Sequence, residues 1–172
     1  MIPGFVIRRS TLADLEALDD LLVLGRLVKS GPPDSFTLMA AKLWVNPDVT
    51  LSLVACPEGD LKRVVSHAQL CHKATKSRSR AELEDVATHP DYLRRGLSSA
   101  LLGRLIWSAQ HDWGVGRIEW ISEDIPDRTD ARRFYLEVVG ARLVDGTDSC
   151  FRLNLPYQAS DYMRPHFVNP FP

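Results

Sequence analysis

Cysteine is scarce in this sequence of 172 residues, and its placement argues against several classes of protein. The three cysteines (Cys56, Cys71 and Cys150) are odd in number and scattered, and no two have the C-x-x-C spacing. A disulfide framework or a zinc site is therefore not expected, and a reducing cytoplasm is the expected location. Long apolar runs are also missing. The N-terminus carries only residues 5–7 before two arginines, too short a run for a signal peptide, and no other stretch approaches membrane-spanning length.

An excess of charge of one sign is missing as well. The formal net charge is -1, so no global attraction to nucleic acid or to an anionic membrane is expected. The five histidines lack the spacing of metal ligands, and we expect no metal. What is present is an ordinary globular composition, with 45% hydrophobic and 25% charged residues, in a chain long enough for one domain with its own core.

The first half of the chain predicts a strand, helices and an antiparallel meander. Residues 4–9 form the first strand, and Thr11 offers an N-cap with Asp14 three residues later. The helix that follows ends before the Gly-Pro-Pro of residues 31–33, and a second helix carries Phe36, Met39 and Leu43 on one face. Three strands joined by short turns come next, and they cover residues 49–55, 62–71 and 81–88.

The second half changes to alternating strands and helices. A helix over residues 97–112 has an amphipathic stripe, formed by Leu101, Leu102, Leu105, Ile106 and Ala109. The remaining predicted elements are a strand at 117–122, a helix at 130–138 and short strands at 141–144 and 150–155. A strand, a helix and a strand over residues 81–122 require a right-handed crossover and one parallel pair. We therefore expect one α/β domain over residues 1–155 and an irregular, proline-rich tail over residues 156–172.

The most informative segment is the loop that leads from the strand at 81–88 into the next helix. The first amides of a helix have no internal partners and lie at the positive end of its dipole. Small residues there let an anion approach the backbone, and Arg94 and Arg95 add positive charge. The segment predicts a phosphate cradle, while an ordinary strand-helix turn remains the alternative. The first helical residues are Gly96, Leu97, Ser98 and Ser99.

Two motifs in the proper order resemble the GNAT superfamily of N-acetyltransferases. The small apolar strand end at 86–88 is followed by residues 93–98, which match the family's loop Q/R-x-x-G-x-G/A. Residues 128–135 resemble its R-x-D-A-x-R-F-Y helix, and Gly140-Ala141 and residues 151–153 its next turn and closing strand. The resemblance implies the GNAT fold: a mixed, mostly antiparallel sheet with helices on both faces and one parallel β-α-β pair.

The sequence departs from the family pattern at three points. Leu93 stands where Gln or Arg is usual, and Ser98 where Gly or Ala is usual. Four residues separate Tyr135 from Gly140 where three are common, which predicts a bulge at the end of that helix. None of these changes removes the backbone amides, which supply most of the anion binding in such a loop.

The resemblance implies acetyl-CoA as co-substrate. Its pantetheine arm would lie along the end of the strand like an added strand, and one backbone amide there would face the thioester carbonyl. The residues implied to bind acetyl-CoA are Val86, Ala87, Thr88, Arg94, Arg95, Gly96, Leu97, Ser98 and Ser99.

Three side chains are candidates for proton transfer. An alkylamine has a pKa of about 10 and must lose a proton before it attacks. Glu82 and Glu84 project from one strand face and Asp85 from the other, and we favour Glu84 as the base with Glu82 second. Both could instead be solvated or paired with arginines. Tyr135 matches the family tyrosine that protonates the departing thiolate, and a core tyrosine is the alternative.

We expect an acyl-CoA-dependent N-acetyltransferase that transfers the acetyl group directly to a small primary amine in a ternary complex. A protein or peptide N-acetyltransferase, a non-catalytic acyl-CoA-binding module and a nucleotide-binding domain remain alternatives. A homodimer is expected by analogy with the family alone.

Overall fold

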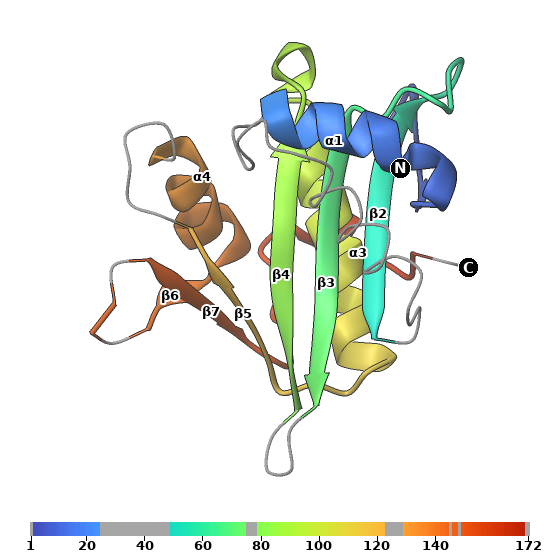
Figure 1. The fold of residues 1–172 in the computed structure, drawn as a ribbon. Coiled ribbons are helices and arrows are strands. Elements are labelled where there is room, and N and C mark those ends of the chain that lie inside the picture. The colour runs from blue at the N-terminus through green and yellow to red at the C-terminus, as the bar shows by residue number, and fades with distance from the viewer. Residues whose placement is uncertain are drawn as a thin grey trace.

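The computed structural model describes residues 2–24, 49–74, 79–122, 129–144, 146–147 and 149–170. Seven strands in this part of the chain form one mixed sheet in the order β1-β2-β3-β4-β5-β7-β6 (Figure 1). All neighbours are antiparallel except β4 and β5, which are parallel as predicted. The strands are β1 (Phe5–Arg9), β2 (Thr50–Pro57), β3 (Ser66–Ala74), β4 (Ser79–Thr88), β5 (Arg117–Ile121), β6 (Arg142–Leu143) and β7 (Cys150–Asn154).

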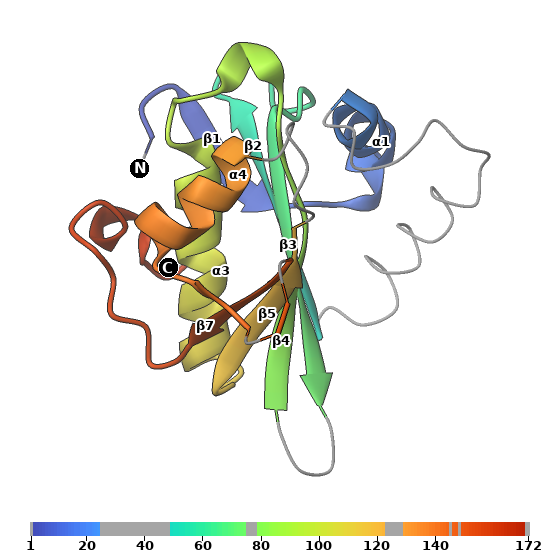
Figure 2. The same ribbon diagram turned by 90° about the vertical axis from the view of Figure 1, so that its left-hand side faces the viewer.

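The described helices cover both faces of the sheet, as the GNAT resemblance implies. Figure 2 shows α1 (Leu15–Leu24) on one face, and α3 (Leu97–His111) and α4 (Thr129–Arg133) on the other. The helix predicted around residues 36–43 lies outside the described residues. None of the described helices is long and apolar enough to cross a membrane.

The predicted start of the first helix is confirmed. A 3-10 turn at Leu12–Asp14 precedes α1, and the Thr11 amide donates to the Asp14 carboxylate at 2.7 Å. Arg8 donates to the same carboxylate at 2.6 Å. Burial would raise the pKa of Asp14, but the hydrogen bonds from Arg8 and Thr11 outweigh it and lower that pKa. Asp14 therefore joins β1 to α1.

One strand boundary differs from the prediction. The third strand was expected from residue 62, but β3 begins at Ser66. The amide of Asp60 bonds the Pro57 carbonyl and the amide of Arg63 bonds the Asp60 carbonyl, so the turn after β2 continues to Arg63. Turn hydrogen bonds within a polar segment have replaced ladder pairing there.

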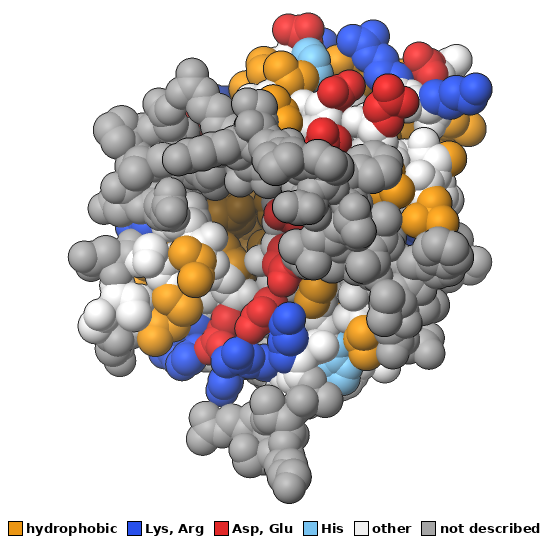
Figure 3. All heavy atoms as spheres, viewed as in Figure 1, with side chains coloured by type: hydrophobic (Ala, Val, Ile, Leu, Met, Phe, Trp, Pro, Cys, Tyr) orange, Lys and Arg blue, Asp and Glu red, His pale blue; other side chains and the backbone are white. Residues whose placement is uncertain are grey.

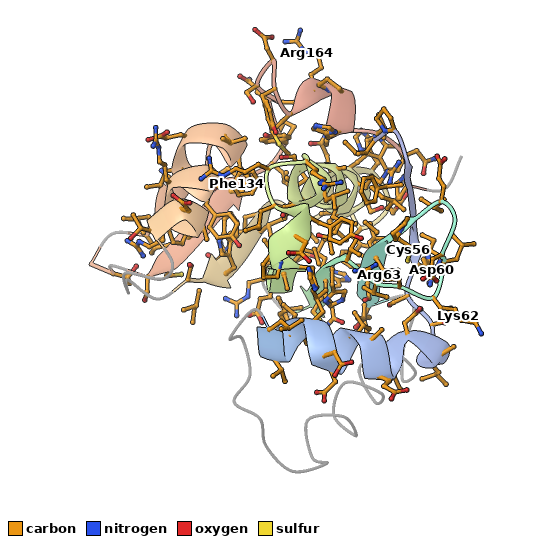
Figure 4. All side chains as sticks on the ribbon, turned by 90° about the horizontal axis from the view of Figure 1, so that it is seen from above. Cys56, Asp60, Lys62, Arg63, Phe134 and Arg164 are labelled. Carbon is orange, nitrogen blue, oxygen red and sulfur yellow. The ribbon has the colours of Figure 1, made fainter. Side chains whose placement is uncertain are left out.

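The main core lies between the sheet and α3. All five residues of the predicted stripe on α3 are buried, each at most 3% exposed. The tail packs over the outer side of this helix: Met163 is fully buried, and the Tyr157 hydroxyl donates to the Val139 carbonyl at 3.0 Å. A Cβ on Gly103 would lie 2.3 Å from the carbonyl oxygen of His166, so only glycine lets the tail come this close. Seen from above, Arg164 of the tail lies across α3 from α1 (Figure 4).

Candidate active site

β4 and β5 form a fork that is open at one end. They pair only at Ala81 with Ile118 and at Glu82 with Glu119, and then separate (Figure 1). Beyond Glu82 no strand among the described residues pairs with the edge of β4 that faces β5. The predicted parallel pair is thus confirmed, and the two strands diverge where the family motif lies.

A bulge interrupts β4 inside the fork, and the sequence did not predict it. Gln69 pairs with Glu84, but His67 pairs with Ala87, so β4 holds one extra residue. Asp85 adopts the left-handed conformation, with φ of 53°. The simple alternation along β4 fails beyond Asp85, because an inserted residue reverses the faces that follow it. Ala87 consequently packs under α1, on the face of Glu82 and Glu84.

The loop after β4 presents a row of free backbone donors. Within the described residues, none of the N–H groups of residues 94–99 donates a hydrogen bond, and the amide of Ala100 is the first to bond, to the Gly96 carbonyl at 3.0 Å. Arg94 and Gly96 are left-handed, with φ of 61° and 78°. Six consecutive donors at the start of a 15-residue helix are suited to bind an anion, and the phosphate cradle stays a prediction.

The two arginines of this loop lie at its surface. Arg94 pairs with Asp130 of α4 at 2.9 Å, and both side chains are largely exposed. The Arg95 guanidinium lies 5.0 Å from the ring centroid of Tyr92. The Arg94–Asp130 pair thus links the loop to the first turn of α4, while the backbone forms the cradle itself.

Ser98 is used differently from what its position suggested. Its hydroxyl lies 2.9 Å from that of Thr88, which lies 2.7 Å from that of Ser66. The Ser66 hydroxyl donates to the Ala87 carbonyl at 3.0 Å. These hydroxyl contacts connect the start of α3 to the end of β4. They therefore fix the position of the loop amides relative to the edge of β4.

Tyr135 lies in the irregular helix that the spacing predicted. Residues Phe134–Val139 form a π-helix that continues α4, and the amides of Gly140 and Ala141 both donate to the Tyr135 carbonyl. The ring of Tyr135 is 7% exposed and packs edge-on against Trp120 with centroids 5.1 Å apart. It belongs to the core, and its role as a proton donor stays a prediction.

Acidic side chains line the other face of the fork. Glu84 accepts a hydrogen bond from Gln69 at 3.3 Å, whereas Glu82 pairs with Arg80 at 2.9 Å and with Lys73 at 3.5 Å. Figure 3 shows a hollow on this side of the molecule, with hydrophobic side chains at its floor and acidic ones beside it. Glu82 thus has two cationic partners and Glu84 has an amide donor, and the choice of Glu84 as the base stays a prediction.

Three residues near the fork escaped the sequence reasoning. Gln69 contacts the favoured base, Trp120 packs on Tyr135, and His67 is 1% exposed, with its Nε2 2.8 Å from the Ser52 hydroxyl. Strand pairing brings Gln69 to Glu84 and His67 to Ser52, whereas Trp120 and Tyr135 come from β5 and the π-helix. The sequence carries no signal for any of these contacts.

Comparison with known proteins agrees with this geometry. The model of the acetyltransferase (GNAT) family matches residues 20–141, whereas the chain matches no curated protein. A protein described as an acetyltransferase of the GNAT family from Desulfovibrio desulfuricans has a TM-score of 0.71 at 15% identity, over 87% of this chain and 98% of its own. Acetyltransferases from Trypanosoma brucei and Streptococcus agalactiae give TM-scores of 0.64 and 0.68 at 22% and 18% identity, over 83% and 89% of this chain and 96% and 99% of theirs. These structures share the fold, and the family model covers more than half of the sequence. The chain belongs to the GNAT family of acetyltransferases.

Proposed function

We propose that the protein transfers the acetyl group of acetyl-CoA to a primary amine of a small molecule, by direct attack in a ternary complex. The strongest support is that two backbone features lie side by side, the amides at the start of α3 and the edge of β4. In the described part of the chain the six amides of residues 94–99, at the start of α3, donate no hydrogen bond. The Ser98–Thr88 contact holds them beside an edge of β4 with which no described strand pairs.

The residues fit acetyl-CoA. The amides of residues 94–99 would hold its diphosphate, and the exposed Arg94 and Arg95 would add positive charge near its phosphates. The pantetheine would pair with β4 along Val86, Ala87 and Thr88, where β5 has separated. Acetyl-CoA supplies an activated acetyl group on a thioester. The backbone near the bulge at Asp85 would then donate to the thioester oxygen as negative charge develops on it.

Glu84 would accept the proton of the amine, directly or through water. Gln69 orients its carboxylate by a hydrogen bond of 3.3 Å, and both side chains lie on the face opposite α3. An amine that enters through the hollow seen in Figure 3 would meet acidic side chains, which favour a cation over an anion. Glu82 is the second candidate, and it pairs with Arg80 and Lys73.

Tyr135 would return a proton to the leaving thiolate. Tyr135 belongs to the π-helix after α4, and its ring packs against both Trp120 and Phe151, at centroid distances of 5.1 and 5.6 Å. A ring packed in this way can direct its hydroxyl without losing order, which is what a general acid requires.

The first test measures thiol release from acetyl-CoA over a panel of polyamines, amino acids, amino sugars and aminoglycosides. Glu84→Gln should lower kcat/KM at least about a hundredfold and remove the acidic limb of the pH–rate profile, on which the base loses its proton, whereas Glu82→Gln should change kcat/KM severalfold. Tyr135→Phe should lose more than tenfold. A Glu84→Gln enzyme with an unchanged pH–rate profile would refute this choice of base.

A second test isolates the cradle. Gly96→Glu should abolish the binding of acetyl-CoA in calorimetry, because the substitution puts a side chain and a negative charge on a left-handed residue at the cradle. Gly59→Glu is the matched control, since a Cβ at this exposed turn glycine meets no other atom within 4 Å. Binding that survives Gly96→Glu would contradict the cradle. Binding without thiol release for any amine or peptide would instead favour a non-catalytic module, and release with peptides alone would favour a protein acetyltransferase. A homodimer stays a prediction by family analogy, and sedimentation would test it.

A further inference from the structure

A cleft of about 300 Å³ lies at the outer edge of the sheet, outside the fork. β6 is the last strand at that edge (Figure 1). Three segments form most of the wall: residues 137–140 around the end of the π-helix, residues 152–154 of β7 and residues 156–160 of the tail. The cleft has the size of a site for a small molecule, and no residue of the candidate active site lines it.

Hydrogen bonds hold the tail in place as one wall of this cleft. The Tyr157 hydroxyl donates to the Val139 carbonyl, and the Ser160 hydroxyl donates to the Val138 carbonyl at 3.3 Å. On the other side, the Tyr157 amide donates to the side chain of Gln110 on α3 at 2.7 Å. The tail is thus tied both to the π-helix and to α3, so the cleft has a fixed shape.

β7 presents a backbone position to the cleft that no described strand covers. β6 pairs with only two residues of β7, and this pairing ends at Arg152. On the other edge of β7, the Leu155 amide donates to the Gly116 carbonyl at 3.0 Å. Successive amides of a strand point to opposite edges, so the amide of Asn154 points away from β5. Asn154 lines the cleft, and its amide is a donor available to a ligand there.

The cleft also has an excess of positive charge. Arg142 and Arg152 lie opposite each other on β6 and β7, and both line the cleft. Arg152 pairs with Glu119 at 2.7 Å, but Arg80 and Arg117 contact the same carboxylate, each at 3.1 Å. Among the described residues, Arg142 has no ion pair or side-chain hydrogen bond. Like charges directly opposite on neighbouring strands destabilise a sheet, so an anion beside Arg142 would be stabilising.

The acidic residue in the wall does not neutralise this charge. Glu137 accepts a hydrogen bond from Arg133 at 2.8 Å, and both side chains are largely exposed at the rim. Its carboxylate therefore already has a cationic partner outside the cleft.

We propose that this cleft binds a small organic anion, whose carboxylate or phosphate group is held by the Arg142 guanidinium and the Asn154 amide. A guanidinium binds either group through two parallel hydrogen bonds, and amides at a sheet edge favour anions. The rest of the ligand would lie against Leu153 and Pro156, with the Gln158 amide as a further polar partner. This site is additional to the proposed acyl transfer and does not depend on it.

The test measures binding by calorimetry at constant ionic strength, in a buffer that contains neither group. The probes are succinate and citrate for the carboxylate, and inorganic phosphate and glycerol phosphate for the phosphate. At least one probe should bind the native protein, and Arg142→Gln should weaken its Kd about tenfold or more, because charge-assisted hydrogen bonds are lost. Arg164→Gln is the matched control, since it removes one exposed positive charge from the tail outside the cleft, and it should leave the Kd unchanged.

A second comparison separates this site from the loop amides of residues 94–99, which are also suited to an anion. Gly96→Glu should leave the binding of the probe unchanged, and amide hydrogen exchange at residues 139–142 should slow when the probe binds. Failure of every probe to bind, or an equal Kd in Arg142→Gln and Arg164→Gln, would overturn the proposal. Binding that is lost in Gly96→Glu and kept in Arg142→Gln would also overturn it. None of these readouts involves acyl transfer, so the proposed function is tested separately by thiol release.

Discussion

Acid should destabilise the protein through His67 well before its carboxylates are protonated. This side chain is 1% exposed, and burial lowers its pKa from 6.5 to about 4, against smaller opposing effects of the Asp85 backbone and the Asp14 charge. Between pH 6.5 and 4 the His67 imidazole therefore binds a proton in the unfolded chain but not in the folded protein. The stability contributed by neutral His67 is complete above pH 6.5 and is lost as the pH falls through this window.

The size of the effect follows from the shift in pKa. One pKa unit corresponds to 1.36 kcal/mol, so the full loss approaches about 3 kcal/mol, of which about 2 kcal/mol has gone at pH 5. Such a loss is a large part of the 5–15 kcal/mol that commonly separates a folded domain from its unfolded chain.

Urea unfolding at pH 7, 6 and 5, followed by tryptophan fluorescence, measures the effect. His67→Gln keeps a polar atom near the Ser52 hydroxyl but cannot take up a proton. The variant should be less stable than the native protein at pH 7, and this difference should shrink by about 2 kcal/mol at pH 5. His111→Gln, at an exposed histidine, is the control and should keep a constant difference. A constant difference for His67→Gln as well would refute the reasoning.

Three further predictions concern stability and order. Ser98→Ala removes the hydroxyl contact with Thr88, so it should lower the free energy of unfolding in urea by about 1 kcal/mol and weaken the binding of acetyl-CoA. An unchanged Kd would show that this contact does not support binding. Gly103→Ala forces the backbone at His166 away, so it should lower the free energy of unfolding by about 1–3 kcal/mol and make the tail sensitive to limited proteolysis. A tail that stays resistant to protease would contradict the close contact. Gly96→Ala puts a Cβ on a left-handed residue and should cost about 1–2 kcal/mol in thermal unfolding, and no change would mean that the loop relaxes.

Periodicity and turn residues predicted most of the elements. The stripe of leucines predicted α3 within one residue, and the change from meander to alternating elements predicted the parallel pair of β4 and β5. These features are local, because each depends on a repeat of side chains along a single element. The extra residue before Gly140 predicted the π-helix for the same reason.

The missed features depend on contacts between elements. The bulge at Asp85 has no glycine or proline to announce it, since aspartate tolerates the left-handed conformation. The contacts of Gln69 with Glu84 and of Ser98 with Thr88 follow from strand register and helix position, which a single sequence does not encode in any repeat. The tail looked irregular because its packing on α3 uses single residues, such as Met163, without periodicity.

Two irregular segments, the bulge in β4 and the π-helix after α4, each contain one residue more than the regular element would. Deleting one residue at either place would keep the element but change which way its side chains point. A deletion in the bulge would make Ala87 face α3 instead of α1. A deletion in the π-helix would rotate Tyr135 about the helix axis by roughly a quarter turn. Such single-residue deletions should thus yield folded proteins that have lost acyl transfer, because each deletion moves a whole wall of the fork and not one side chain.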